Sequence, residues 1–364
     1  MKKRTSLLLI CLLLLILSSY ANAEGFTITD TQTETSFFEE QTELLITATG
    51  DVTFGGNMKD NPASTIYTRA LEAHGGDLSY FFANVYDIFS SDDLTLINFE
   101  GTLTNVSRPA KNNTFCFRAD PSHVLALSLS SVEAVALENN HVQDFGETGF
   151  QDTVNALEGQ GIIWSSDGHI GEYTVNGTRI AMLAYQTFNG AYPDLSERVP
   201  LEVAAAKQTH DLVIVSYHWG TEKDYLPNDK QIKLGRLTID SGADLVLGHH
   251  SHRINPIEYY NGHYIVYSLG NCAFSGNSRP DDMDTFIFQM KFNIENGQAQ
   301  TGAFRIIPCS ISSVTGLSGK QSGENDFAVT PFAEGSDAAK RVLDKLMKNG
   351  KKLEYAVSEY PTQW

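Results

Sequence analysis

Three histidines within four positions, His249, His250 and His252, carry the clearest chemical signal in this sequence. They follow residues 244–247, where a short apolar run containing the β-branched Val246 predicts a buried strand. Imidazole nitrogens are the commonest protein ligands for transition metals. In an extended backbone His250 and His252 share a face, and His249 points the opposite way. The pattern predicts a metal site, with a histidine-rich surface loop as the alternative.

Four other strand-like apolar runs also end in side chains able to bind a metal. These are Asp51 after residues 44–50, Glu100 after 94–97, Asn140 with His141 after 134–137, and His218 after 211–217. Glu100 would be costly to bury alone, so a metal ion or, alternatively, a salt-bridge partner is expected beside it. Where strands alternate with helices, parallel βαβ units bring such ends to one edge of a sheet. The five sets are therefore expected to converge.

The elements that must position these residues follow an α/β pattern. Helices are predicted at residues 78–89, 122–131, 146–157, 200–209, 229–241 and 336–347, and a further strand at 179–185. Residues 285–294 and 302–311 are predicted to form antiparallel strands of a second layer. Residues 312–325 are rich in Gly and Ser and are predicted to be a loop.

The N-terminus has the pattern of a secretory signal peptide over residues 1–23. Basic residues at 2–4 precede an apolar run at 7–17 and the sequence Ala-Asn-Ala at 21–23. The run is shorter than the roughly 20 residues of a spanning helix, so cleavage and an extracytoplasmic or secreted protein are expected. A membrane anchor, if the signal is not cleaved, is the alternative. Residues 24–43 are predicted to be a flexible linker.

Composition narrows the classes of partner. The chain has 26 basic and 44 acidic residues and a net charge of −18, which argues against nucleic acid and gives no basic stripe for anionic lipid. An anionic substrate would need local cations, which a bound metal would supply. Outside the leader only Cys116, Cys272 and Cys309 remain; they cannot all pair, and the fold is not a disulfide scaffold.

Six motifs together resemble one known family. GDVTFGG, NFEGTLT, NNHVQDFG, HWGTEKDYLPNDKQ, GADLVLGHHSH and YSLGN, in this order and spacing, resemble the CapA family of poly-γ-glutamate capsule biosynthesis proteins. The resemblance covers residues 44–311 and implies a calcineurin-like metallophosphoesterase domain. That fold is an α/β four-layer sandwich of two mixed β-sheets flanked by helices. Residues 312–364 would then be a loop and a C-terminal helical extension.

The resemblance also implies roles for individual residues. The implied metal ligands are Asp51, Glu100, Asn140, His218, His250 and His252. His141 matches the imidazole that protonates the leaving oxygen, and Arg118 and Asn271 lie in motifs that could orient an anionic substrate. A structural role is the alternative for these last two. Mixed nitrogen and oxygen ligands suit one or two divalent transition metal ions, and Mn, Zn and Fe all remain open.

Three residues depart from the pattern of calcineurin-like enzymes. Thr53 stands where a histidine is usual, which implies a weakly held second ion or a mononuclear site. Ser251 replaces a proline between two histidines, which loosens that loop. Cys272 replaces an aromatic residue and is expected to be a buried thiol.

Two main hypotheses of function follow. The first is an exported metal-dependent hydrolase, in which a metal-activated water attacks a phosphoester or an amide of a γ-glutamyl polymer. A catalytic acid at His141 favours it, because a structural metal site is closed and needs no acid. The alternative is a non-catalytic component that binds poly-γ-glutamate during assembly or export, with capsule-synthesis membrane proteins as partners. A secreted binding module without catalysis is the third candidate.

Overall fold

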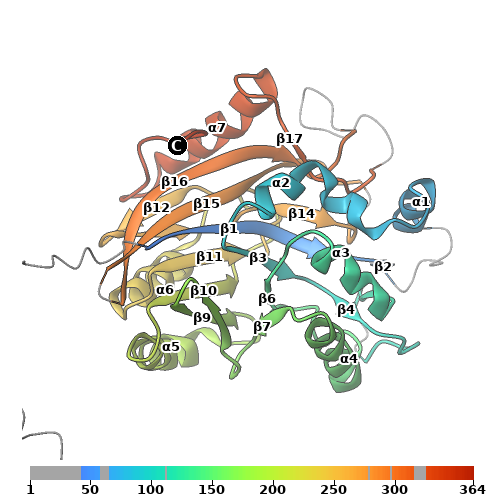
Figure 1. Ribbon diagram of the computed structural model, residues 1–364, viewed down its shortest axis with the longest axis horizontal. Coiled ribbons are helices and arrows are strands. Elements are labelled where there is room, and N and C mark those ends of the chain that lie inside the picture. Colours follow the sequence, from blue (N-terminus) through green and yellow to red (C-terminus); the bar gives the residue numbers. More distant parts are fainter. Residues whose placement is uncertain (1–41, 58–64, 111–112, 278, 296, 315–324) are drawn as a thin grey trace, which may run out of the picture. The chain divides into compact units, whose positions relative to one another are not determined.

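Two β-sheets form the frame of this protein in a computed structural model (Figure 1). The structure describes residues 42–57, 65–110, 113–277, 279–295, 297–314 and 325–364. The predicted signal peptide and nearly all of the predicted linker lie outside these ranges, as does most of the predicted 312–325 loop. Within the described part no helix is both long and apolar enough to cross a membrane.

The larger sheet is built around β1. Its strands, in spatial order, are β17 (Thr330–Pro331), β16 (Gln298–Ser310), β15 (Asp284–Glu295), β1 (Thr42–Thr53), β3 (Leu94–Phe99), β6 (Ala134–Ala136) and β7 (Ile163–Ser165), with β14 (Asn271–Phe274) also paired to β1. β1 runs parallel to β3 and β14 and antiparallel to β15. The prediction that residues 285–294 and 302–311 form a second layer is therefore wrong. The two strands are antiparallel, but β15 pairs with one edge of β1. β15 and β16 therefore extend the sheet of β1.

The second sheet is smaller and also mixed. Its order is β12 (Ile257–Tyr260), β13 (His263–Val266), β11 (Leu245–His249), β10 (Leu212–His218), β9 (Thr178–Gln186) and β8 (Gly171–Val175). The central strands β9, β10, β11 and β13 are parallel, and β8 and β12 are antiparallel edges. A short third sheet contains β2 (Gly56–Asn57), β5 (Phe117–Ala119) and β4 (Thr102–Leu103).

Three apolar cores stack the elements into four layers. The helical elements are α1 (Ile66–Ala73), η2 (Leu78–Val85), α2 (Tyr86–Phe89), η3 (Pro121–Val124), α3 (Leu125–Ser128), α4 (Gly146–Gly159), α5 (Tyr192–Lys207), α6 (Asp229–Asp240) and α7 (Asp337–Gly350). One core joins the larger sheet to η2, α2, α3 and α4, a second lies between the two sheets, and a third joins the smaller sheet to α5 and α6 (Figure 1). The expected α/β sandwich of two mixed sheets flanked by helices is confirmed.

Strand alternation explains this layering, because successive side chains point to opposite faces. On β10, Leu212 and Ile214 enter the core between the sheets, whereas Val213 and Val215 face α5 and α6. Both sheets are buried on both faces, so their central strands are continuous apolar runs. Because these apolar runs are continuous, the sequence predicted the central strands close to their observed positions.

Several predicted helices have different bounds in the structure. Residues 78–89 form a 3₁₀ segment and then the short α2, and residues 122–131 similarly divide into η3 and α3. The helix predicted at 200–209 begins at Tyr192, because Pro193 near its start fits the first helical turn and does not break the helix. The C-terminal helix α7 packs Val342 and Leu346 into the core between the sheets.

The carboxyl group of Asp92, beside the larger sheet, is buried, and among the described residues one of its two oxygens has no hydrogen-bond partner. Asp92 lies just before β3, where its Oδ2 accepts a hydrogen bond of 2.6 Å from Thr95 and its Oδ1 is buried without a partner. Burial, followed in smaller measure by the charges of Glu133 and Asp93, raises the pKa of Asp92 to about 7. The folded protein therefore keeps a proton that the unfolded chain releases above its ordinary pKa near 3.8.

We expect Asp92→Asn to stabilise the protein more at pH 8 than at pH 5. The folded wild type binds the extra proton between the two pKa values, so its stability falls as the pH rises through this window. The neutral amide removes that loss, and the gain in unfolding free energy should be larger at pH 8 by about 1–2 kcal/mol. Urea denaturation at both pH values measures it. Asp87→Asn, at an exposed carboxylate, is the control, and an equal gain at both pH values would contradict the prediction.

Candidate metal centre

The predicted ligands come from the carboxyl ends of strands in both sheets. In the larger sheet Asp51 lies near the end of β1, and Glu100 directly follows β3. In the smaller sheet His218 is the last residue of β10, and His250 follows β11. The sequence placed all of these ends along one edge of one sheet. They meet instead at a junction between two sheets, because the two parallel strand groups pack face to face.

Asp51 is the centre of the contacts at this junction. Its carboxylate is fully buried and accepts a 2.8 Å hydrogen bond from the Asn98 amide. Nδ1 of His252 lies 3.1 Å from Oδ2, and Nδ1 of His249 lies 3.4 Å from Oδ1. Burial acts to raise the pKa of Asp51, but hydrogen bonds and charge from the two histidines hold it well below its ordinary value. Asp51 is thus ionised, which is the form in which a carboxylate binds a metal.

A close backbone approach places Asp51. The Asp51 N–H donates to the Gly270 carbonyl at 2.9 Å, and a side-chain carbon at Gly50 would lie only 2.0 Å from the same oxygen. Only glycine at position 50 lets β1 lie this close to the segment that leads into β14. Asn271 is consequently the register partner of Asp51.

The histidine loop is not extended, and the predicted orientation of its side chains is wrong. His250 has a φ of 91° and His252 a φ of 54°, so the backbone turns twice through the left-handed region. His249 at the end of β11 and His252 after the turn therefore both lie beside the Asp51 carboxylate, instead of on opposite faces. Arg253 helps to hold the turn, because its Nη1 donates to the His252 carbonyl at 2.8 Å and its Nη2 contacts Asp281.

Glu100 lies opposite this loop with an uncompensated charge. Its side chain is buried, Oε1 is 3.7 Å from His141 Nε2 and 3.9 Å from His218 Nε2, and Oε2 has no hydrogen-bond partner. Burial, followed by the charge of Asp51, raises the pKa of Glu100 well above its ordinary value. Thr53, at the position of the missing histidine, donates a 2.6 Å hydrogen bond to the Glu100 carbonyl. Thr53 therefore supports the backbone of Glu100.

Two further imidazoles are suited to metal binding by their neutral state. His218 Nε2 and His250 Nδ1 are 3.1 Å apart. Burial lowers the pKa of His218 well below its ordinary value and that of His250 to about 4. Burial also acts to lower the pKa of His252, but the charges of Glu100 and Asp51 outweigh it and raise that pKa to about 9. A neutral imidazole is the form that binds a metal.

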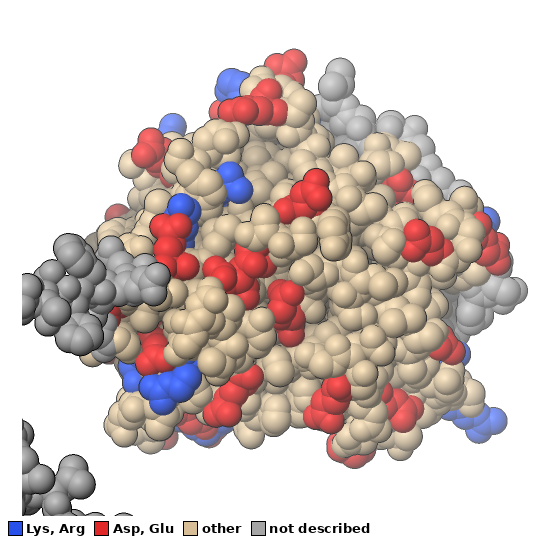
Figure 2. All heavy atoms as spheres, viewed as in Figure 1, with Lys and Arg blue, Asp and Glu red and all other residues tan. Residues whose placement is uncertain are grey.

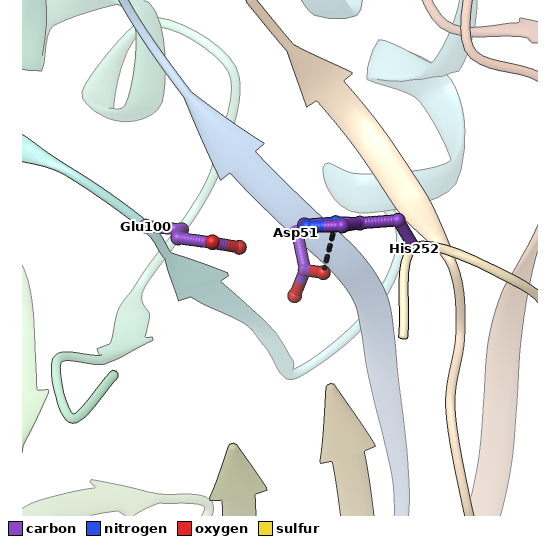
Figure 3. A group of neighbouring side chains, drawn as sticks. All are labelled: Asp51, Glu100 and His252. Atoms are coloured by element: carbon purple, nitrogen blue, oxygen red, sulfur yellow. Dashed lines mark ion pairs between the residues drawn. The ribbon is translucent and has the colours of Figure 1, made fainter. Parts of the chain in front are cut away.

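These donors fit a divalent metal ion. Ligand atoms of Asp51, Glu100 and His252 all lie within 4.8 Å of one another, and Figure 3 shows their side chains converging from three segments of the chain. Oε2 of Glu100 and Oδ1 of Asn140 are buried oxygens without a partner, which a cation would satisfy. The neighbouring Asn139 is instead used internally, since its amide donates to the Phe99 carbonyl at 2.8 Å.

His141 is oriented by a carboxylate that the sequence did not single out. Asp144 Oδ2 lies 2.8 Å from His141 Nδ1 and also accepts the Phe117 N–H at 2.8 Å. The imidazole therefore directs Nε2 towards Glu100. The spacing of three residues between His141 and Asp144 within one turn was the available signal. Asn98, which lies in β3 and donates to Asp51, was not among the predicted site residues.

A cavity of about 800 Å³ opens beside the centre. His141, His252 and Asn271 form part of its wall, and Asn271 Oδ1 lies 2.8 Å from His252 Nδ1. Asn271 thus holds a ligand as well as facing the cavity. Arg118 lines a smaller neighbouring cavity of about 200 Å³ and donates to the Val106 carbonyl. The structure does not bring Arg118 to the metal centre itself.

Comparisons with known proteins converge on one group. The sequence model of the family described as "Bacterial capsule synthesis protein PGA_cap" matches residues 45–276, which include every predicted site residue. "PGA biosynthesis protein CapA" of Bacillus subtilis (strain 168) is 30% identical over 299 residues, covering 76% of each chain. "Capsule biosynthesis protein CapA" of Bacillus anthracis is 28% identical over 300 residues, covering 75% of this chain and 68% of that protein.

A solved structure is similar at lower identity. The calcineurin-like phosphoesterase YfkN from Bacillus subtilis gives a TM-score of 0.42 at 14% identity, covering 85% of this chain and 98% of that chain.

We expect Glu100→Gln to weaken stabilisation by metal without destabilising the metal-free protein. Among the described residues Oε2 of this buried carboxyl group has no hydrogen-bond partner, so the change to a neutral amide breaks no hydrogen bond of that oxygen. The gain in unfolding free energy on adding Mn²⁺ or Zn²⁺ should fall by about 1.4 kcal/mol or more, equivalent to a tenfold loss of affinity.

Thermal denaturation with and without metal measures this effect. Glu258→Gln is the matched control, because Glu258 is also buried but forms a 2.8 Å ion pair with Arg236. This control should destabilise the metal-free protein. If Glu100→Gln did the same, Glu100 would belong to a salt bridge and not to a metal site.

We further expect Arg253→Ala to weaken metal binding although Arg253 is not a ligand. Without its guanidinium the His252 carbonyl loses a hydrogen bond that holds the left-handed turn. Loss of such a supporting contact should lower metal affinity about 10- to 100-fold, measured by isothermal titration calorimetry. Arg279→Ala, at an exposed arginine nearby, should leave the affinity unchanged. Equal metal affinities of the Arg253→Ala and Arg279→Ala variants would show that the turn keeps its conformation without Arg253.

Proposed function

This chain belongs to the PGA_cap family of bacterial capsule synthesis proteins, and from this premise we propose that it is an exported metal-dependent hydrolase of capsule poly-γ-glutamate metabolism. The printed names of its relatives support the metabolic setting. The signal-like pattern of residues 1–23 supports export. The hydrolytic part of the proposal rests on the metal centre.

One observation carries the proposal of catalysis. His141 is held by Asp144 on one ring nitrogen and presents the other to Glu100 at the wall of an open cavity. A purely structural metal site would need neither an oriented imidazole nor access for a substrate. An imidazole placed beside the ligands, with its second nitrogen directed inward, is suited to proton transfer.

Each residue of the site would have a separate role in hydrolysis. Asp51, Glu100, Asn140, His218, His250 and His252 would hold one or two divalent transition metal ions. The bound metal would act as a Lewis acid and make hydroxide available from water near neutral pH. His141 Nε2 would donate a proton to the leaving oxygen or nitrogen as the scissile bond breaks. Asp144 would keep Nδ1 protonated and stabilise the imidazolium before the proton leaves. Asn271 would keep His252 in place through its 2.8 Å contact.

We expect His141→Ala to lose turnover but keep its metal. Removing a general acid typically lowers kcat by about 10²- to 10⁴-fold, whereas no predicted ligand is changed. Hydrolysis of p-nitrophenyl phosphate and bis-p-nitrophenyl phosphate with added Mn²⁺ or Zn²⁺, together with metal content, measures both effects. His169→Ala is the control, since His169 is an exposed histidine stacked on Trp164. Its activity should match the wild type.

The same experiment distinguishes the second candidate function. Stoichiometric metal without turnover of either ester would favour a non-catalytic role in binding or assembling poly-γ-glutamate, with membrane proteins of capsule synthesis as partners. The printed description of the family as capsule synthesis proteins is what favours this candidate. Absence of any metal after reconstitution would contradict both the hydrolase and the site.

A further inference from the structure

The cavity beside the metal centre is larger than a reacting group needs. Its volume of about 800 Å³ lies in the range of sites that enclose a whole small molecule. Phe115, Phe117 and Phe274 form an apolar wall that leads away from His141 and His252. The cavity therefore has room for a part of a substrate that lies beyond the reacting group.

Two cationic side chains other than histidine line this cavity, and only one of them is available to a ligand. Arg253 is 5% exposed, and its guanidinium contacts Asp281 and the His252 carbonyl. Lys223 is exposed, and among the described residues its ammonium has neither an ion pair nor a hydrogen bond. Among the described lining residues, Lys223 is thus the exposed cation without an ion pair or hydrogen bond.

The backbone at Lys223 is fixed even though its side chain is exposed. Its φ of 68° lies in the left-handed region, which is strained for a lysine. Its N–H donates to the Ser251 carbonyl at 2.7 Å, which ties the turn to the histidine loop. On the other side Gly220, with a φ of 87°, packs against the side chain of Gln231 at the start of α6. These contacts hold the backbone of Lys223 beside the histidine loop.

The protein has a negative net charge, so an anionic group of a substrate needs a cation nearby to bind it. The net charge is −18, and on the face in Figure 2 acidic side chains are widely spread and basic ones are fewer. A substrate group that is negatively charged but does not reach the metal would be repelled unless a local cation received it. Glu222 also lines the cavity and adds a negative charge beside Lys223, so an anionic group there depends on the lysine.

From these contacts we propose that Lys223 binds a carboxylate of the substrate that is remote from the scissile bond. The site then selects substrates with an anionic group beyond the reacting one, and a γ-linked glutamyl chain, which carries a free carboxylate on every unit, is of this class. Lys223 acts as a specificity residue and takes no part in bond breaking. This inference rests on the proposed function, because it assumes a scissile bond at the metal centre. Its test measures binding and does not require turnover.

Binding of a defined oligomer to the metal-loaded protein tests the proposal. The probes are fluorescein-labelled tri-γ-glutamate and its analogue in which the α-carboxylates are carboxamides, followed by fluorescence anisotropy. Lys223→Met should weaken binding of the acid about 10- to 100-fold and leave the amide analogue unchanged. Lys223→Arg should restore binding, because it keeps a cation at the same position. Metal content should be the same in all variants.

Lys230→Met is the matched control, because Lys230 is an exposed lysine on α6 whose loss changes the net charge equally. If this variant weakened the acid as much as Lys223→Met does, the effect would be that of net charge, and the proposal would fail. It would also fail if the wild type bound acid and amide equally or bound neither. Binding that depends on Lys223 without hydrolysis of either p-nitrophenyl ester would overturn only the hydrolase. Hydrolysis without such binding would overturn only the role of Lys223.

Discussion

Two carboxylates buried at one junction are the constraint on which this structure depends. Asp51 and Glu100 are each about 1% exposed or less, and an isolated charge in such a place is very costly. Asp51 is compensated within the protein by His249, His252 and Asn98. Glu100 is not, and its second oxygen has no partner. A fold that maintains this imbalance is suited to receive a cation.

The surrounding architecture serves to bring the two carboxylates together with the imidazoles. Each sheet delivers its ligands where parallel strands end, and each strand is anchored by apolar side chains on both faces. Irregular backbone occurs at the junction, where Gly50 permits close contact and His250 and His252 adopt positive φ. Strained backbone at such positions is typical of functional sites, because the rest of the fold stabilises it.

The centre and the cavity make different contributions to function. The centre has donors that suit a metal and an imidazole that Asp144 orients, and both bear on the proposed class of reaction. The cavity has an aromatic wall and the exposed cation Lys223, which bear on the proposed choice of substrate. Membership of a capsule synthesis family is compatible with both, since a polymer with many carboxylates is an anionic ligand of extended length.

The sequence by itself determined the α/β class, the central strands and nearly all the candidate ligands. Strands buried on both faces are continuous apolar runs, and polar side chains directly after them are conspicuous. Asp51, Glu100 and the histidines were found in this way. The same local signal could not show that β15 and β16 extend the sheet of β1, because strand pairing is a contact between residues distant along the chain.

Only the tertiary structure decided the details on which the chemistry depends. The left-handed turns at His250 and His252 place His252 beside the same carboxylate as His249, and such turns arise from long-range contacts such as that between Asp51 and the His250 N–H. The partnership of Asp144 with His141 and the separation of Arg118 from the centre likewise follow from how loops pack. Residue type is a local property that the sequence states directly, whereas distance and burial depend on the whole fold.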